Sequence, residues 1–252
     1  MAPKVAIVFY SMYGHIQKLA EAEKEGLKKA GIEADLFQVP ETLPEEVLAK
    51  MHAPPKSDIP VIDAKTLESY DAFLIGIPTR YGNFPAQWKA FWDTTGAQWA
   101  SGAYWGKYAG IFVSTGTPGG GQETTAINAM STLAHHGVIY VPLGYKTAFG
   151  QLANLSEVRG GSAWGAGTFA GADGSRQPTA LELEVATIQG ESFGNAISKI
   201  NFATAGGKGQ AVGTKEKTIE STRNDREGNE EPEIETKDKE GPCGLPTKCS
   251  IL

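Results

Sequence analysis

The clearest structural pattern of this 252-residue chain starts at residue 5 and reads Val5-Ala6-Ile7-Val8-Phe9-Tyr10-Ser11-Met12-Tyr13-Gly14-His15-Ile16. Its first five residues are a continuous apolar run, as expected for a strand that is buried on both faces of a parallel sheet. Helical spacing follows over residues 16–27, and the segment ends at Gly31. The sequence therefore predicts a strand, a polar turn and an amphipathic helix in direct succession.

Four further apolar runs of strand length follow along the chain. They occupy residues 33–39, 71–76, 108–113 and 138–141. Helix-length amphipathic segments lie between them, and this alternation predicts an open, doubly wound parallel sheet of five strands. In such a sheet, ligands bind beyond the carboxyl ends of the strands, so the residues after each strand are the first candidates for a site.

The second half of the chain departs from this alternation in two places. Residues 144–179 are rich in glycine and aromatic side chains, and a long irregular segment inside a compact domain is typically functional or part of an interface. A last helix is predicted at about residues 180–201, which completes an α/β domain over residues 1–202. Residues 203–252 are polar and mixed in charge, so we expect a disordered C-terminal tail.

The composition limits the classes of function. Apolar residues make up 40% and charged residues 21% of the chain, which is enough to build a substantial core. The formal net charge of −6 argues against nucleic acid as the main partner, because neutralising phosphates requires a basic surface. No apolar stretch approaches the roughly 18 residues of a membrane-spanning helix, and we find no secretory signal. The sequence thus predicts a cytoplasmic protein.

The two cysteines, Cys243 and Cys249, lie close to the printed end of the sequence. We therefore expect no disulfide framework in the domain, and a cysteine pair without a neighbouring histidine is a poor zinc site. Cys249-Ser250-Ile251-Leu252 matches a C-a-a-X box, whose final leucine predicts geranylgeranylation of Cys249. Stable anchoring to the cytoplasmic face of a membrane needs a second signal, for which palmitoylation of Cys243 is the candidate. The alternative is a pair of unmodified cysteines.

The turn Ser11-Met12-Tyr13-Gly14-His15-Ile16 is the first candidate site. A phosphate bound there would meet free backbone N–H groups, the positive end of the helix and the Ser11 hydroxyl. The turn lacks both the lysine of a Walker A loop and the G-x-G-x-x-G pattern of a dinucleotide site, so a monophosphate such as that of FMN fits better. Taken alone, the same residues would also suit an ordinary capped turn between a strand and a helix.

Two more candidate loops follow the third and fourth strands. Gly76-Ile77-Pro78-Thr79-Arg80-Tyr81-Gly82-Asn83-Phe84-Pro85 offers a rigid turn, hydrogen-bond donors and aromatic faces. Ser114-Thr115-Gly116-Thr117-Pro118-Gly119-Gly120-Gly121 has glycines that let the backbone approach a flat ring. Each loop by itself is more often a flexible connection. Three such loops after strands one, three and four converge on one crevice, and this convergence favours a binding site.

These motifs resemble those of the WrbA family of flavodoxin-like proteins. The resemblance rests on SMYGHI (11–16), PTRYGN (78–83), TGAQWASG (95–102), STGTPGGGQE (114–123), LAHHG (133–137) and GADGSRQP (171–178), in this order over nearly the whole predicted domain. It implies a flavodoxin-like five-stranded parallel sheet in the order 2-1-3-4-5, with an insertion after the fourth or fifth strand. It also implies a homotetramer that uses FMN to pass two electrons from NAD(P)H to quinones.

The resemblance also implies roles for individual residues. The residues implied to hold the FMN phosphate are Ser11, Met12, Tyr13, Gly14, His15 and Ile16. Those implied to meet one edge of the flavin are Pro78, Thr79, Arg80, Tyr81, Gly82 and Asn83. Those implied on its pyrimidine side are Ser114, Thr115, Gly116, Thr117, Gly119, Gly120 and Gly121. His136 matches a flavin-contacting histidine, and Tyr13 and Trp99 match positions that meet the nicotinamide or quinone. Pro118 and Gly119 lengthen the third loop relative to many bacterial members, which affects the expected contacts of residues 117–120.

Some of these side chains have plainer explanations from the sequence alone. His135 and His136 could serve the dipole at a helix C-terminus before Gly137. Trp99 could pack beneath the sheet. Three aromatic side chains with helical spacing are expected in the core or in a subunit contact, namely Trp88, Phe91 and Trp92.

The predicted reaction is a ping-pong relay in which NAD(P)H passes a hydride to FMN and leaves, after which a quinone takes its place. Arg80 would stabilise the negative charge of the reduced flavin, which favours two-electron transfer. The sequence identifies no certain catalytic acid or base and no metal site. Two alternatives remain open: a one-electron flavodoxin carrier, and a membrane-attached regulatory or scaffold flavoprotein.

Overall fold

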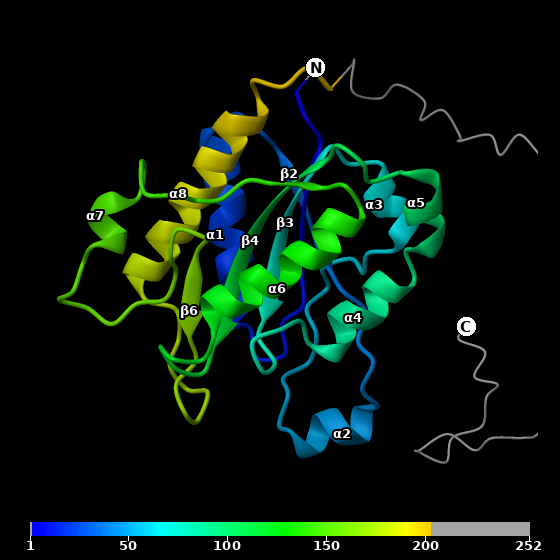
Figure 1. Cartoon of the computed structure of the whole chain (residues 1–252). Helices are drawn as coiled ribbons and strands as arrows, with labels where there is room; N and C mark the ends of the chain where they lie inside the picture. Colours follow the sequence, from blue (N-terminus) through cyan, green and yellow to red (C-terminus); the bar gives the residue numbers. More distant parts are fainter. Residues whose placement is uncertain (1, 203–252) are drawn as a thin grey trace, which may run out of the picture. The chain divides into compact units, whose positions relative to one another are not determined.

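The computed structural model describes residues 2–202 and contains a parallel sheet between layers of helices (Figure 1). The strands are β1 (Val5–Phe9), β2 (Ala34–Gln38), β3 (Ala72–Pro78), β4 (Tyr108–Thr115), β5 (Ile139–Tyr140) and β6 (Gly167–Phe169). Their order is β2-β1-β3-β4-β5, with β6 also paired to β4. The predicted doubly wound sheet and its strand order are therefore confirmed.

Two short strands share the position beside β4. β5 pairs with Tyr108 and Ala109 at the start of β4, and β6 pairs with residues 113–115 at its end. The fifth strand is thus shorter than the predicted run of residues 138–141, and the insertion that follows it supplies β6. This sixth strand is absent from the sequence-based prediction.

Helices cover both faces of the sheet (Figure 1). On one face lie α1 (His15–Lys29) and α8 (Ala180–Ile197), and on the other α3 (Ala64–Glu68), α4 (Ala86–Asp93), α5 (Gly96–Ser101) and α6 (Gln122–His135). Two further short helices are α2 (Glu45–Lys50) and α7 (Phe149–Leu152). Alternation along β1 separates two cores, because Ile7 packs with the α1 and α8 side chains whereas Val8 packs with those of α4 and α6.

Helices α1 and α8 approach each other at backbone distance. A Cβ on Gly26 would lie 2.0 Å from the carbonyl oxygen of Thr187, and a Cβ on Gly190 would lie 2.1 Å from that of Glu23. Glycine is required at both positions for this approach. The Glu23 side chain is fully buried, its carboxyl oxygens have no partner among the described residues, and burial raises its pKa well above the ordinary value. This interface fixes α1 so that its first turn stays at the carboxyl end of β1.

The segment of residues 144–179 is largely irregular, as expected, apart from α7 and β6. The predicted tail of residues 203–252, with Cys243 and Cys249, lies outside the described residues. No helix in the described part of the chain has the length and apolar character needed to cross a membrane.

Candidate functional site

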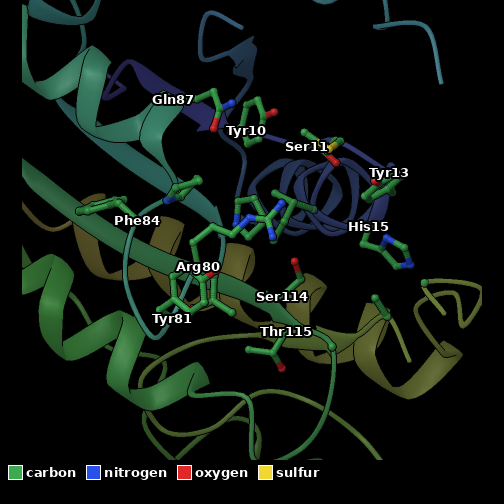
Figure 2. A pocket seen from close by; sticks show the side chains of 18 of the residues that line it. Tyr10, Ser11, Tyr13, His15, Arg80, Tyr81, Phe84, Gln87, Ser114 and Thr115 are labelled. Carbon is green, nitrogen blue, oxygen red and sulfur yellow. The ribbon is translucent and has the colours of Figure 1, made fainter. Parts of the chain in front are cut away.

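The three predicted loops surround one cavity of about 730 Å³ at the carboxyl ends of β1, β3 and β4 (Figure 2). Its volume lies within the range of about 300–1,000 Å³ that is usual for small-molecule and cofactor sites. The predicted residues that line it are Ser11, Met12, Tyr13, His15, Ile16, Pro78, Thr79, Arg80, Tyr81, Ser114, Thr115 and Gly116. Strands β3 and β4 run two residues further than predicted, so Pro78 and Thr115 end strands instead of belonging to loops.

The turn between β1 and α1 has the geometry of an anion site. Gly14 precedes the helix with φ of 85°, and a Cβ at this residue would meet nothing within 4 Å. The Gly14 N–H donates to the Ser11 hydroxyl oxygen at 3.1 Å, and the first helical hydrogen bond runs from the Lys18 N–H to the Gly14 carbonyl oxygen. The N–H groups of residues 15–17 therefore have no acceptor within the helix. Together with the positive helix end they favour a phosphate at this turn.

Residues 171–177 close the turn from the other side. His15 Nε2 lies 2.8 Å from the carbonyl oxygen of Arg176, and Lys18 Nζ donates to Gln177 Oε1 at 2.7 Å. Gly171 and Gly174 line the cavity. The glycine-rich insertion therefore contributes one wall of the site.

The buried Glu182 carboxylate holds this wall in place. Its Oε2 accepts from the Thr168 hydroxyl at 2.7 Å, from the Thr179 N–H at 2.9 Å and from Arg176 Nη1 at 3.0 Å. Its Oε1 accepts from the Gly160 N–H at 2.8 Å. Glu182 is fully buried, and the Thr179 hydroxyl in turn accepts from its backbone N–H, which makes a capping box at the start of α8. One side chain thus joins four residues that are spread over the insertion.

Residues 80–83 form a tight turn that presents an exposed aromatic ring at the cavity. The backbones of Arg80 and Asn83 exchange hydrogen bonds of 2.9 and 3.0 Å, and the two residues between them, Tyr81 and Gly82, have φ of 54° and 72°. Positive φ is strained for tyrosine, and the Asn128 amide supports the turn by donating to the Gly82 carbonyl oxygen at 2.6 Å. Tyr81 is fully exposed. Backbone strain that is maintained by its surroundings is a feature of functional sites.

Arg80 supplies positive charge to the cavity. Figure 2 shows its side chain lying across the cavity between Tyr10 and Ser114. No carboxylate in the described part of the chain forms an ion pair with its guanidinium group. The charge is therefore free to meet an anionic or electron-rich edge of a ligand.

Other predicted site residues do not line the cavity, namely Gly14, Gly82, Asn83, Trp99, Thr117, Gly119, Gly120, Gly121 and His136. Gly14, Gly82 and Asn83 shape the turns that carry lining residues. The loop after β4 has a turn of its own, in which the Gly120 N–H donates to the Thr117 carbonyl oxygen at 3.0 Å. Trp99 lies on α5 and is 61% exposed, so it does not pack beneath the sheet.

His136 lies in an aromatic cluster, next to the end of α6. Its ring centroid is 5.6 Å from that of Trp92 and 5.1 Å from that of Tyr104. The Thr95 hydroxyl donates to the Trp92 carbonyl oxygen, so it accepts from His136 Nε2 at 2.9 Å, and the buried Nδ1 has no partner among the described residues. Burial, helped by the nearby His135, lowers the pKa of His136. Trp88, Phe91 and Trp92 are buried in the core, as expected.

Sequence reasoning missed several residues of the cavity wall, among them Tyr10, Leu43 and Gln87. Tyr10 directly follows β1, and Gln87 lies in the first turn of α4, directly after the second candidate loop. Both positions adjoin predicted motifs, and this adjacency could have identified them from the sequence. Leu43 lies in the segment after β2, where the sequence has no motif.

A model of the NADPH-dependent FMN reductase family matches residues 4–150. The chain belongs to this family. The minor allergen Alt a 7 of Alternaria alternata is 68% identical over 201 residues, which are 79% of this chain and 98% of the relative. The NAD(P)H quinone oxidoreductase PST2 of Candida albicans is 63% identical over 197 residues, which are 78% of this chain and 97% of the relative.

The solved structures agree on the fold. A flavodoxin, WrbA-like protein from Agrobacterium tumefaciens matches with a TM-score of 0.54 at 20% identity, over 79% of this chain and 99% of that protein. The flavodoxin-like fold predicted from the resemblance to the WrbA family is thereby confirmed.

Proposed function

We propose that the protein is an FMN-dependent NAD(P)H:quinone oxidoreductase. The observation that carries the proposal is the single cavity into which the phosphate turn, the Arg80 turn and the end of β4 all project. Membership of the FMN reductase family and the identity to the Candida albicans quinone oxidoreductase support the same activity.

The residues of the cavity fit FMN. Gly14, with its positive φ and open surroundings, leaves room for a phosphate against the first turn of α1. The turn is followed by no second anion loop of the dinucleotide type, which favours the mononucleotide over FAD. The carboxyl end of β4 and the start of the 80–83 turn line the cavity, as do the hydroxyl-bearing residues Thr79 and Ser114, and together they would hold the ring system.

The finer mechanism that we propose is ping-pong. Bound FMN would supply hydride acceptance from NAD(P)H and hydride donation to a quinone. The chain contributes position and charge: Arg80 offsets negative charge at the cofactor, and the exposed rings of Tyr13 and Tyr81 border the open side, where a flat nicotinamide or quinone would stack. A one-electron carrier is less well supported, because an unpaired cation in the cavity favours the doubly reduced, anionic cofactor.

The proposal predicts a yellow protein whose cofactor takes part in two half-reactions. Mass spectrometry of the released cofactor is expected to give FMN. In stopped-flow experiments, NAD(P)H is expected to bleach the bound flavin and a quinone to restore its colour. In steady-state kinetics, double-reciprocal plots of rate against NAD(P)H concentration, each at a fixed quinone concentration, should give parallel lines. Release of FAD, an empty protein, or flavin that NAD(P)H does not bleach would contradict the proposal.

We also propose that the protein is a homotetramer in which Trp99 closes the site of a neighbouring subunit. The exposure of Trp99 and Trp105 supports this assembly, since large exposed aromatic side chains are typical of interfaces. Light scattering at micromolar concentration is expected to give four times the chain mass of 26.8 kDa. Trp99→Ala should raise KM for the quinone more than it changes FMN content. A monomer mass would contradict the assembly.

The predicted lipid anchor and the division into a domain of residues 1–202 and a tail remain proposals, because they depend on residues outside those described.

A further inference from the structure

A carboxylate outside the predicted loops lies behind one wall of the cavity. This residue is Glu41, which follows β2. The Tyr10 hydroxyl donates to its Oε2 at 2.8 Å, and the Gln87 amide donates to its Oε1 at 2.9 Å. Tyr10 and Gln87 are both buried and both line the cavity, and Figure 2 shows them at the same edge. Glu41 therefore joins the end of β1 to the first turn of α4.

Lys56 extends this connection to the phosphate turn. Its Nζ lies 3.0 Å from Glu41 Oε2 and donates to the Ser11 carbonyl oxygen at 3.1 Å. The same ammonium lies 4.5 Å from the centre of the Tyr10 ring, within cation–π distance. The Glu41–Lys56 pair thus contacts both the wall at Tyr10 and the first residue of the turn that would hold the phosphate.

Glu41 is ionised at neutral pH. Burial raises its pKa, but hydrogen bonds, led by the one from Lys56, outweigh burial and lower the pKa to about 2. The backbone N–H groups of Thr42 and Leu43 also donate to Oε1, at 2.9 and 3.1 Å. Bonds to an ionised acceptor are stronger than bonds between neutral groups, so this carboxylate holds its donors firmly.

We propose that Glu41 is a positioning residue of the FMN site, which fixes Tyr10, Gln87 and, through Lys56, the Ser11 carbonyl group in the arrangement that FMN meets on binding. This inference rests on the proposed FMN-dependent function. A wall that is already ordered loses less conformational entropy when the ligand binds, so the loss of Glu41 weakens FMN binding. The two charges also act on the redox potential, because both contact the Tyr10 side chain, which itself lines the cavity.

Glu41→Gln is the first test, because the amide has the size of the carboxylate but cannot accept hydrogen bonds from all of the same donors. Either orientation of its NH₂ group faces donors: Tyr10 and Lys56 on one side, or two backbone N–H groups and the Gln87 amide on the other. We expect the FMN dissociation constant to rise about 10- to 100-fold. The matched control, Glu45→Gln on the exposed face of α2, should stay within about twofold of wild type.

The midpoint potential of bound FMN distinguishes a specific effect of the Glu41 and Lys56 charges from a general loss of structure around the site. Glu41→Gln removes a negative charge and is expected to raise the potential, whereas Lys56→Met removes a positive charge and is expected to lower it. Lys56→Arg keeps the charge and should restore the wild-type potential. A merely structural role would move the two neutralising variants in the same direction or leave both unchanged.

Wild-type FMN binding, measured in the same titration, distinguishes failure of this inference from failure of the proposed function. If wild type binds no FMN, the proposed function is wrong. If wild type binds FMN and Glu41→Gln has the same affinity and potential, only the positioning role is overturned. Should Glu41→Gln not fold, the Lys56 variants decide, because equal potentials in Lys56→Met and Lys56→Arg would overturn the inference.

Discussion

Gly14→Asp is expected to abolish FMN binding without unfolding the protein. A Cβ at residue 14 meets nothing within 4 Å, and aspartate is among the residues that tolerate the positive φ of 85°. The new carboxylate, however, would occupy the helix end where the phosphate is expected. Placing like charges together costs several kcal/mol, and about 3 kcal/mol already corresponds to a dissociation constant more than 100-fold higher. Fluorescence titration of apoprotein with FMN measures this change.

Gly14→Asn is the matched control for charge. Asparagine has the size of aspartate, adopts the same backbone conformation and can also cap the first turn of α1, but it brings no charge. We therefore expect a much smaller loss of FMN affinity, and thermal unfolding of both apoproteins close to that of wild type. Equal FMN affinity in the two variants would mean that the phosphate does not bind at this turn.

The sequence predicts the position of the cavity because the carboxyl ends of parallel strands meet at one edge of the sheet. The apolar runs identify β1, β3 and β4, and the residues after them, such as Ser11, Arg80 and Thr115, do line one cavity. Local pattern is sufficient for this step, since each loop adjoins its own strand. It is insufficient for β6, whose three residues lie in a glycine-rich segment and have no apolar run of their own.

The groups that hold the site together depend on contacts between distant residues, which the sequence does not indicate. Glu41 belongs to a polar stretch after β2, and its partners Tyr10 and Gln87 are 31 and 46 residues away. Glu182 fits the capping-box pattern at the start of α8, but nothing in that pattern predicts its bond to Gly160, 22 residues earlier. Glu23 occupies an apolar position of the helical spacing in α1, and the structure buries it accordingly.

Glu182→Gln preserves the size of the side chain and leaves the surface of the domain unchanged. Among changes of this kind in the described domain, we expect it to cause the largest loss of stability. The side chain is fully buried and pairs with the partly exposed Arg176 at 3.0 Å. Removing one partner of a buried ion pair costs about 3–5 kcal/mol, and we expect the lower end because Arg176 can still reach water. For a domain of this size that corresponds to a fall in Tm of roughly 6–12 °C. Calorimetry or circular dichroism measures the shift.

Glu184→Gln provides the control, because Glu184 lies two residues along the same helix and is exposed, and its change should stay within about 0.5 kcal/mol. Arg176→Met, alone and combined with Glu182→Gln, completes a double-mutant cycle that isolates the interaction energy of the pair.

The cavity should respond to Glu182→Gln as well. Glu182 holds the segment whose Arg176 carbonyl oxygen contacts His15, so its loss frees one wall of the phosphate turn and weakens FMN binding. A variant with wild-type Tm and wild-type FMN affinity would show that the insertion is held by its backbone contacts with β4 and not by this carboxylate.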